Sequence, residues 1–219
     1  MTSNYKYTRN WENQQKAIFG GVGEYDIPVI QPEEYHHVEW IPFNKAKSNS
    51  KRKGMGIHHF IDDYQFAREW TNIDSYVEMF KQYDYVMSPD FSMYTDFPKA
   101  LQIYNHFRKH WIGAYLQSKG VHVIPTISWS TPDSFEWCFD GEPLEWCFDG
   151  EPRESVVAVS SVGCNRVTDK FVEGYNAMID ALQPSTIIFY GKIPSQCTGN
   201  IVHVKSYGTQ MKEAITNGW

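Results

Sequence analysis

The sequence predicts an α/β fold with a mostly parallel sheet of about six strands and flanking helices. From Gly56 onward, short apolar runs alternate with segments of helical periodicity. Several of the apolar runs are near-continuous stretches rich in Val and Ile, which is typical of parallel strands buried on both faces. An open twisted sheet and an incomplete β/α barrel both fit this pattern, because a full barrel typically needs about 250 residues.

The first predicted elements lead up to a long helix. GIHHFIDD is a strand, DSYVEMFKQY a short helix, and DYVMSPD a second strand that Pro89 ends. The longest helix is FPKALQIYNHFRKHWIGAYLQSKG, with Asp96 as its N-cap and Gly120 as its C-terminal stop. One apolar stripe of this helix is expected to face the core: Leu101, Tyr104, Phe107, Trp111 and Tyr115.

The second half of the chain repeats the alternation. The strands are predicted in VHVIPTISW, SVVAVSSVG, STIIFYG and NIVHVKSYG, and the helices in DKFVEGYNAMIDALQP and TQMKEAITNG. We therefore expect residues 56–219 to form a single α/β domain. Residues 1–55 are expected to form an irregular N-terminal arm and a basic loop, because Gly and Pro interrupt them without a sustained period.

The basic loop, KAKSNSKRKG, has two interpretations. It is a solvated loop, or it contacts the phosphates of a nucleic acid. The cations in question are Lys45, Lys47, Lys51, Arg52 and Lys53.

Composition narrows the class of protein. The net charge of -6 argues against broad nonspecific nucleic-acid binding. No apolar run approaches the roughly 20 residues of a membrane span, and the N-terminus lacks the apolar core of a signal peptide, so we expect a cytoplasmic protein with no membrane partner. The four cysteines form no CxxC pair and are expected to be reduced structural thiols.

The nonapeptide at 135–143, FEWCFDGEP, recurs at 144–152 with only its first residue changed. Both copies lie between the third and fourth predicted strands. Because loop-closure entropy grows only logarithmically with length, a tandem duplication is tolerated best in a loop or a hairpin-like excursion. The alternative is a second functional loop that carries Glu145 and Asp149.

Several uncommon strings occur together in one order: MGIHHFIDDYQFAREW, YVMSPDFSMYTDFPKALQIYN, GAYLQSKGVHVIPTISWS, FEWCFDGEP, SVVAVSSVG and LQPSTIIFYGK. From Gly56 to Lys192 the chain resembles a family of bacterial and phage proteins catalogued only as a domain of unknown function. The resemblance implies a mobile-element context for many members and no particular activity. Members of that family carry one CFDG element, so either Asp140 or Asp149 matches the family position.

In parallel α/β folds, ligands bind outside the carboxyl ends of the strands. The predicted strand ends bring acids together there, and such a cluster costs stability unless a proton or a cation compensates it. The candidates for chemistry are Asp62, Asp63, Asp90 and Lys192. The candidates for substrate binding are Tyr64, Tyr94, Asp96, Trp129, Asp140 and Asp149.

Two kinds of chemistry fit these residues. Paired carboxylates could act as acid and base on a glycosidic bond, with Trp129 and Tyr94 as sugar platforms. They could instead hold a divalent cation for phosphoester hydrolysis, with Lys192 stabilising developing negative charge in either case. The opposing interpretation is structural, with Asp90 in a turn and Asp96 as a helix cap.

The sequence therefore leaves two functions open. One is a carboxylate-dependent hydrolase that acts on a sugar or phosphoester. The other is a noncatalytic accessory protein of a mobile element, which binds a nucleic acid or a protein partner through the basic loop. His106 and His110 share a helix face at a spacing that can bind zinc, but adjacent Arg108 and Lys109 favour a solvated face.

Overall fold

The computed structural model describes residues 12–131, 134, 150–164 and 167–216. It confirms the α/β class: two parallel sheets, one of four strands and one of three, are flanked by helices. The strands of the first are β3 (Glu39–Pro42), β4 (Met55–His58), β5 (Tyr85–Met87) and β6 (Val123–Ile124). Those of the second are β7 (Val156–Ser160), β8 (Thr186–Tyr190) and β9 (Ile201–Val204).

The two sheets follow one another as parts of a single curved wall. A parallel bridge between Thr126 and Ala158 joins the end of β6 to β7, so the strands run in chain order from β3 to β9. That is the order of a β/α barrel. Within the described residues no pairing joins β3 to β9, so the barrel is not closed.

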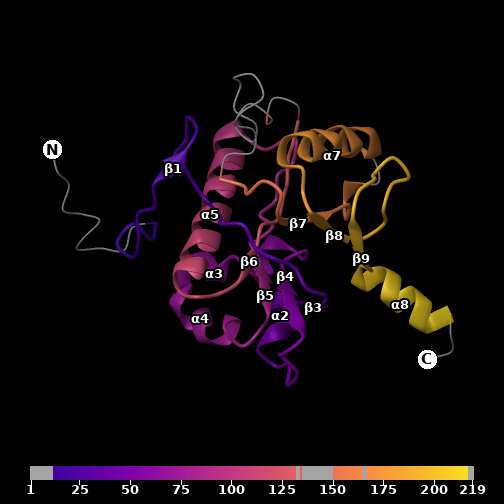
Figure 1. Ribbon diagram of the computed structural model, residues 1–219, viewed down its shortest axis with the longest axis horizontal. Helices are drawn as coiled ribbons and strands as arrows, with labels where there is room; N and C mark the ends of the chain where they lie inside the picture. Colours follow the sequence, from indigo (N-terminus) through magenta and orange to yellow (C-terminus); the bar gives the residue numbers. More distant parts are fainter. Residues whose placement is uncertain (1–11, 132–133, 135–149, 165–166, 217–219) are drawn as a thin grey trace.

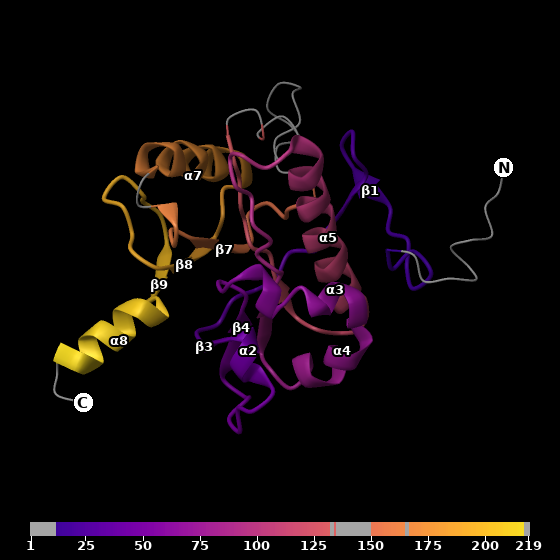
Figure 2. The ribbon, with the colours of Figure 1, turned by 180° about the vertical axis from the view of Figure 1, so that it is seen from behind.

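Helices flank this wall (Figure 1). They are α2 (Phe43–Ala46), α3 (Arg68–Asn72), α4 (Asp74–Phe80), α5 (Lys99–Ser118), α7 (Thr168–Leu182) and α8 (Tyr207–Thr216), with a 3-10 turn at Asp63–Gln65. Figure 2 shows α3, α4 and α5 on one side of the molecule and α7 above β7 and β8, while α8 projects away. A short hairpin, β1 (Gly21–Val22) with β2 (Ile27–Pro28), lies beside α5.

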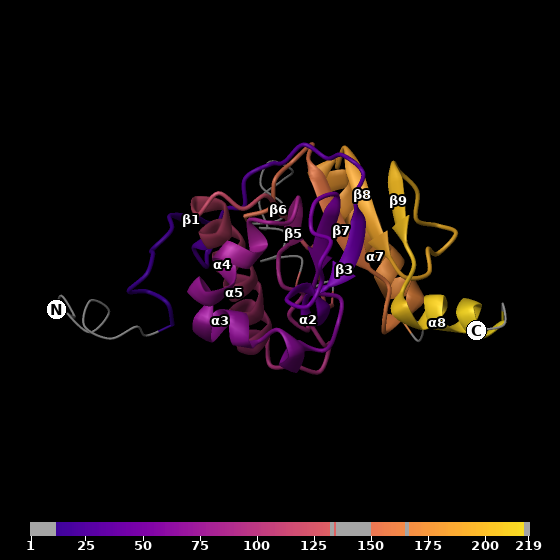
Figure 3. The same cartoon turned by 90° about the horizontal axis from the view of Figure 1, so that it is seen from below.

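Three apolar clusters hold these layers together. One packs β3–β6 against α2–α5, and a second packs β7–β9 against α7. The third lies on the inner, concave face, where side chains of β5, β6, β7 and β8 meet. There the ring of Tyr190 lies 4.7 Å from His58 and 5.0 Å from Phe60, so the ends of β4 and β8 touch across the interior. Figure 3 shows the strands gathered between α3–α5 and the α7–α8 side.

The element boundaries differ from the sequence prediction in two places. Glu39–Pro42 lie in the predicted irregular arm but form β3, which pairs with β4 along its whole length. The long helix begins at Lys99 with Pro98 in the cap position and no side-chain cap, so Asp96 does not cap it. None of the helices in the described part of the chain combines the length and the hydropathy that a membrane span needs.

The buried face of α5 is unusual because its first half is polar. Gln102, Asn105, His106, Lys109 and His110 are all buried, whereas Leu101 of the predicted apolar stripe is exposed. The expectation of a solvated histidine face is therefore wrong. The polar face exists because loops, rather than apolar strand side chains, pack against this half of the helix.

The last three residues of the second nonapeptide copy are part of the core. Gly150, Glu151 and Pro152 are buried, and the Gly150 carbonyl accepts a hydrogen bond of 2.8 Å from Ile30 N. Gly150 has a φ of +78°, and a Cβ there would lie 2.6 Å from the His110 ring, so only glycine fits. The first copy and the rest of the second lie outside the described residues. The predicted excursion is therefore not described.

Candidate functional site

A cavity of about 890 Å³ opens at the carboxyl ends of the strands. Its walls come from the segments that follow β4, β5, β6 and β7, and from the end of β8 and the start of α8. This is the edge at which parallel α/β folds place their ligands.

Six of the sequence-predicted residues line this cavity: Asp62, Asp63, Tyr64, Asp90, Tyr94 and Trp129. Two others do not line it. Asp96 is exposed, and the exposed Lys192 uses its backbone carbonyl to accept a 2.6 Å hydrogen bond from Ser161 Oγ. Asp140 and Asp149 lie outside the described residues.

Asp63 is fixed by the neighbouring strand end. Its two carboxylate oxygens accept hydrogen bonds from Ser92, one from the backbone N–H (3.0 Å) and one from the hydroxyl (2.8 Å). The carbonyl of Ser92 in turn accepts a 2.7 Å bond from Asn105 on α5. Asp63 therefore has a set orientation at the rim, and the loop after β5 is held from both sides.

Asp90 lies at the end of the β5 segment, in a different environment. The cavity leaves it partly accessible, yet no described residue donates a hydrogen bond to its carboxylate. Desolvation by the surrounding walls raises the pKa of Asp90 to about 7, with Lys109 opposing the rise and the negative charge of Asp63 adding to it. A carboxyl group with such a pKa can both donate and accept a proton near neutrality.

Aromatic side chains form much of the wall. Tyr64 and Tyr94 are 78% and 60% exposed, which is high for such large rings at the mouth of a cavity. Trp129 is held rigidly, with its indole 5.2 Å from the Phe171 ring and directly over Gly174, where a Cβ would collide with it. Exposed rings beside a rigid one provide flat apolar faces on which sugar rings and bases stack.

The sequence analysis missed other wall residues. Lys170 and Tyr207, from α7 and α8, also line the cavity. Cys164, after β7, lines it as well. Burial, with the nearby charge of Asp90, raises the pKa of Cys164, so it is a neutral thiol and a poor nucleophile at physiological pH. Helical positions such as Lys170 carry no strand-end signal and could not be found by reading strand ends.

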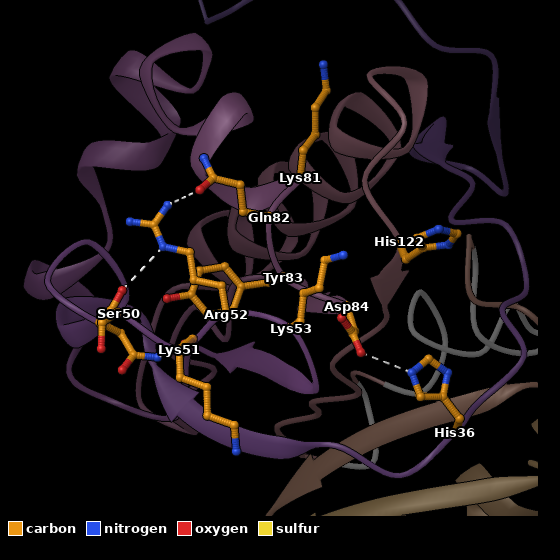
Figure 4. A pocket seen from close by; sticks show the side chains of 11 residues that line it. His36, Ser50, Lys51, Arg52, Lys53, Lys81, Gln82, Tyr83, Asp84 and His122 are labelled. Atoms are coloured by element: carbon orange, nitrogen blue, oxygen red, sulfur yellow. Dashed lines mark hydrogen bonds and ion pairs between the residues drawn. The ribbon is translucent and has the colours of Figure 1, made fainter.

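A second, shallower hollow lies near the amino ends of β4, β5 and β6 (Figure 4). Lys51, Arg52, Lys53 and Lys81 line it, together with His36, His122 and Asp84. Two of these cations already have acidic partners: Lys51 bonds Glu39, and Lys81 bonds Glu78. Lys45 and Lys47 do not line this hollow, and the ammonium of Lys45 instead lies 4.6 Å from the centre of the Tyr207 ring.

The divalent-cation hypothesis needs several oxygen ligands in one place. Within the described residues, no group of three or more His, Cys, Asp or Glu side chains is arranged to hold a metal ion.

Comparison with known proteins places the chain in a family. Residues 19–208 match the model of the family described as domain of unknown function DUF4417. The chain belongs to the DUF4417 family. This match begins before Gly56 and ends after Lys192, the limits of the resemblance seen in the sequence. It includes β3 and every described segment that lines the cavity.

Two relatives come from mycobacteriophages. The chain is 34% identical to the Gene 1 protein of Mycobacterium phage L5, over 89% of this chain and 83% of that protein. It is 31% identical to the Gene 1 protein of Mycobacterium phage D29, over 93% and 75%. No solved structure matches the chain. The DUF4417 description and these names specify no reaction, so a function has to be argued from the cavity.

Proposed function

We propose that this DUF4417 protein is a carboxylate-dependent hydrolase that cleaves a glycosidic bond in the cavity at the strand ends. The observation that carries the proposal is Asp90, a carboxyl group with a pKa of about 7 in an aromatic-walled cavity. Hydrolysis of a glycosidic bond needs an acid that protonates the leaving oxygen, and enzymes obtain one at neutral pH by desolvating a carboxyl group.

The different surroundings of Asp90 and Asp63 give these two carboxyl groups different roles. Asp90 in its neutral form donates its proton to the leaving oxygen as the glycosidic bond breaks. The resulting Asp90 carboxylate then takes a proton from the water that attacks the sugar carbon, so the neutral acid is regenerated. Asp63, held by Ser92, keeps its carboxylate oriented toward the positive charge that develops on the sugar ring. Tyr64, Tyr94 and Trp129 supply stacking surfaces for the rings on either side of the bond.

A sugar is favoured over a phosphoester because of the charges in the wall. Lys170 is the one Lys, Arg or His among the described residues that line the cavity, whereas Asp62, Asp63 and Asp90 also lie there. A phosphoester would add negative charge to an acidic rim without the cationic clamp that phosphoryl transfer uses. A neutral, ring-bearing substrate meets no such repulsion.

The pH dependence of turnover tests this proposal. Because Asp90 has to be protonated to act as the acid, kcat/KM for a glycoside substrate is expected to fall tenfold per pH unit above pH about 7. The measurement is a pH–rate profile on a panel of aryl glycosides and natural oligosaccharides. Failure to turn over any member of the panel, or a profile that rises through pH 7, would count against Asp90 as the acid.

A second candidate function rests on the hollow lined by Lys51, Arg52 and Lys53. We propose as an alternative that this hollow contacts the phosphates of a nucleic acid, because no described residue pairs with Lys53 and Arg52 bonds only neutral groups, among them Gln82. The acidic partners of Lys51 and Lys81 reduce the local charge, so this candidate has weaker support.

Salt titration separates the two candidates. If the hollow binds nucleic acid, replacing Lys51, Arg52 and Lys53 with Gln should reduce the slope of log K against log salt for single-stranded DNA by about 2. The control removes two charges elsewhere, Lys205→Gln just before α8 and Lys212→Gln within it, and should leave the slope unchanged. Equal effects of the two sets would show that the hollow is not a specific contact surface.

A further inference from the structure

We propose that the mouth of the cavity binds a sugar chain, and that Tyr207 at the start of α8 is the outermost stacking platform for it. The inference rests on the proposed function and names its substrate class, a long oligosaccharide or polysaccharide rather than a small glycoside. Three exposed rings at the mouth carry the inference, and we call them the aromatic collar: Tyr64, Tyr94 and Tyr207.

The exposed apolar side chains of the molecule gather at this mouth. Nine large apolar side chains are exposed among the described residues, and five of them line the cavity: Tyr64, Tyr94, Val162, Val167 and Tyr207. These five belong to the segments that follow four different strands, β4, β5, β7 and β9. Single exposed apolar residues are ordinary, but a group of them around one opening marks a binding surface.

Tyr207 is held in place although its ring is exposed. Its backbone N–H donates a 3.1 Å hydrogen bond to the hydroxyl of Tyr190 at the end of β8. The Lys45 ammonium lies 4.6 Å from the centre of the Tyr207 ring. Because Lys45 belongs to α2, this contact links the segments that follow β3 and β9, the two edge strands of the open barrel. Tyr207 is still 55% exposed, so much of its surface remains available to a ligand.

Tyr94 is likewise presented by a fixed backbone. Its ring meets Phe97 edge-on, with 5.0 Å between the ring centres. The buried side chain of Gln102 on α5 donates to the carbonyls of Tyr94 (3.2 Å) and Phe97 (2.9 Å). Part of the polar face of α5 therefore holds the loop that carries this ring. Rings that are already ordered lose less freedom when a ligand stacks on them.

The groups between the rings favour a sugar chain over other ligands. A sugar has an apolar ring face and hydroxyl groups at its edge, so it needs flat rings next to hydrogen-bonding groups. Six hydroxyl side chains line the same cavity: Ser92, Thr95, Ser128, Ser130, Ser160 and Ser206.

Two other kinds of occupant fit the mouth less well. Single-stranded nucleic acid also stacks on aromatic rings, but it needs a cationic groove, and Lys170 is the one Lys, Arg or His among the described residues of the lining. A folded protein partner needs roughly 800 Å² of surface on each side. The collar instead surrounds an opening.

The position of the collar predicts a dependence on chain length. The cavity of about 890 Å³ is near the upper end of the range, roughly 300–1,000 Å³, of pockets that enclose most of a small ligand. The collar lies at the exposed mouth of this space. A sugar unit that stacks on Tyr207 is therefore expected to be joined to others that fill the cavity, and affinity should rise as the chain grows long enough to reach the collar.

Isothermal titration calorimetry tests this with gluco-, xylo- and chito-oligosaccharides from the disaccharide to the octasaccharide. The full chain carries Asp90→Asn, so that the probe is not cleaved. Affinity should rise with length in at least one series. Adding Tyr207→Ala should lower the affinity for the longest chain of that series about three- to tenfold, the effect of one stacking contact, and should have little effect on the disaccharide. Tyr207→Phe keeps the ring and should keep the affinity.

The matched control is Ile215→Ala, which removes another exposed apolar side chain of α8 that does not line the cavity. It should bind every probe as the parent does. Absence of binding, equal affinity for short and long chains in every series, or equal losses for Tyr207→Ala and Ile215→Ala would each overturn the inference. Binding of a single-stranded DNA probe with the same dependence on Tyr207 would also overturn it.

Turnover of aryl glycosides by the wild-type chain, measured in parallel, separates this inference from the proposed function. Turnover without length-dependent binding would overturn the inference and leave the hydrolase in place. Length-dependent binding that requires Tyr207, without turnover of any glycoside or oligosaccharide, would support the sugar-binding mouth and count against the hydrolase.

Discussion

Replacing Glu151 with alanine is expected to lower the free energy of unfolding by about 3–5 kcal/mol. Glu151 is the buried acceptor for Lys109 and His110, and its removal leaves the Lys109 ammonium without its carboxylate in the interior. Glu151→Gln should cost less, because an amide oxygen in the place of Oε1 can still accept from Lys109. Urea unfolding of the purified chain measures both changes.

The duplicated nonapeptide provides the control for this experiment. Glu142 occupies the same place in the first copy, within the same eight-residue context EWCFDGEP. Glu142→Ala should change the free energy of unfolding by less than about 0.5 kcal/mol, because Lys109 and His110 already have their partner in Glu151. Equal losses for the two alanine variants would contradict the assignment of the second copy to the core.

Replacing Asp90 with asparagine is expected to reduce turnover of a glycoside by about 10²–10⁴ and at the same time to stabilise the fold. The loss of turnover follows from removing the proton donor. It should be largest for sugars with poor leaving groups and small for aryl glycosides with very good ones, because the latter need little protonation. Equal loss for both substrate classes would argue that the substitution damages binding rather than acid catalysis.

The gain in stability follows from linkage. The pKa of Asp90 is raised in the folded chain, so its contribution to stability is complete below pH about 4 and is lost as the pH rises through about 7. At pH 8, Asp90→Asn should therefore be more stable than the wild type by roughly 1–2 kcal/mol, a figure reduced for the access of water through the cavity. The difference should shrink at pH 5. Unfolding experiments at the two pH values check this, and a constant difference would mean that ionisation of Asp90 does not strain the fold.

Much of the scaffold could be predicted because it depends on local patterns. The runs of Val and Ile that become β7 and β8 are buried on both faces, as parallel strands require. The rule that ligands bind at carboxyl ends then pointed to Asp63, Asp90 and Trp129, which line one cavity. These residues could be chosen from the chain alone because strand ends are marked by where an apolar run stops.

The rest of the site depends on contacts between distant segments. Lys109 and His110 look solvated in the sequence, since nothing local indicates that Glu151 and Pro28 will enclose them. Their positions at i and i+1 on α5 carry information only once the segment that carries Glu151 is seen to pack on that helix face. Similarly, β3 was missed because EWIP contains one strand-breaking proline and gains its pairing from β4.

The sequence alone also does not show which copy of the duplicated nonapeptide belongs to the core. Two copies of EWCFDGEP are indistinguishable by composition, and only the position of Gly150 between His110 and Pro28 decides which copy supplies the buried glutamate. The copy that precedes β7 directly is the one whose glycine and glutamate reach α5.

The most direct test of the whole account is the titration midpoint of the Asp90 carboxyl in the unmodified chain, followed by ¹³C NMR from pH 4 to pH 9. We predict a midpoint of about 7, with the carboxyl half protonated at neutral pH in a cavity that holds it ready as a proton donor. A midpoint near 4, the value of an ordinary solvated aspartate, would contradict the account.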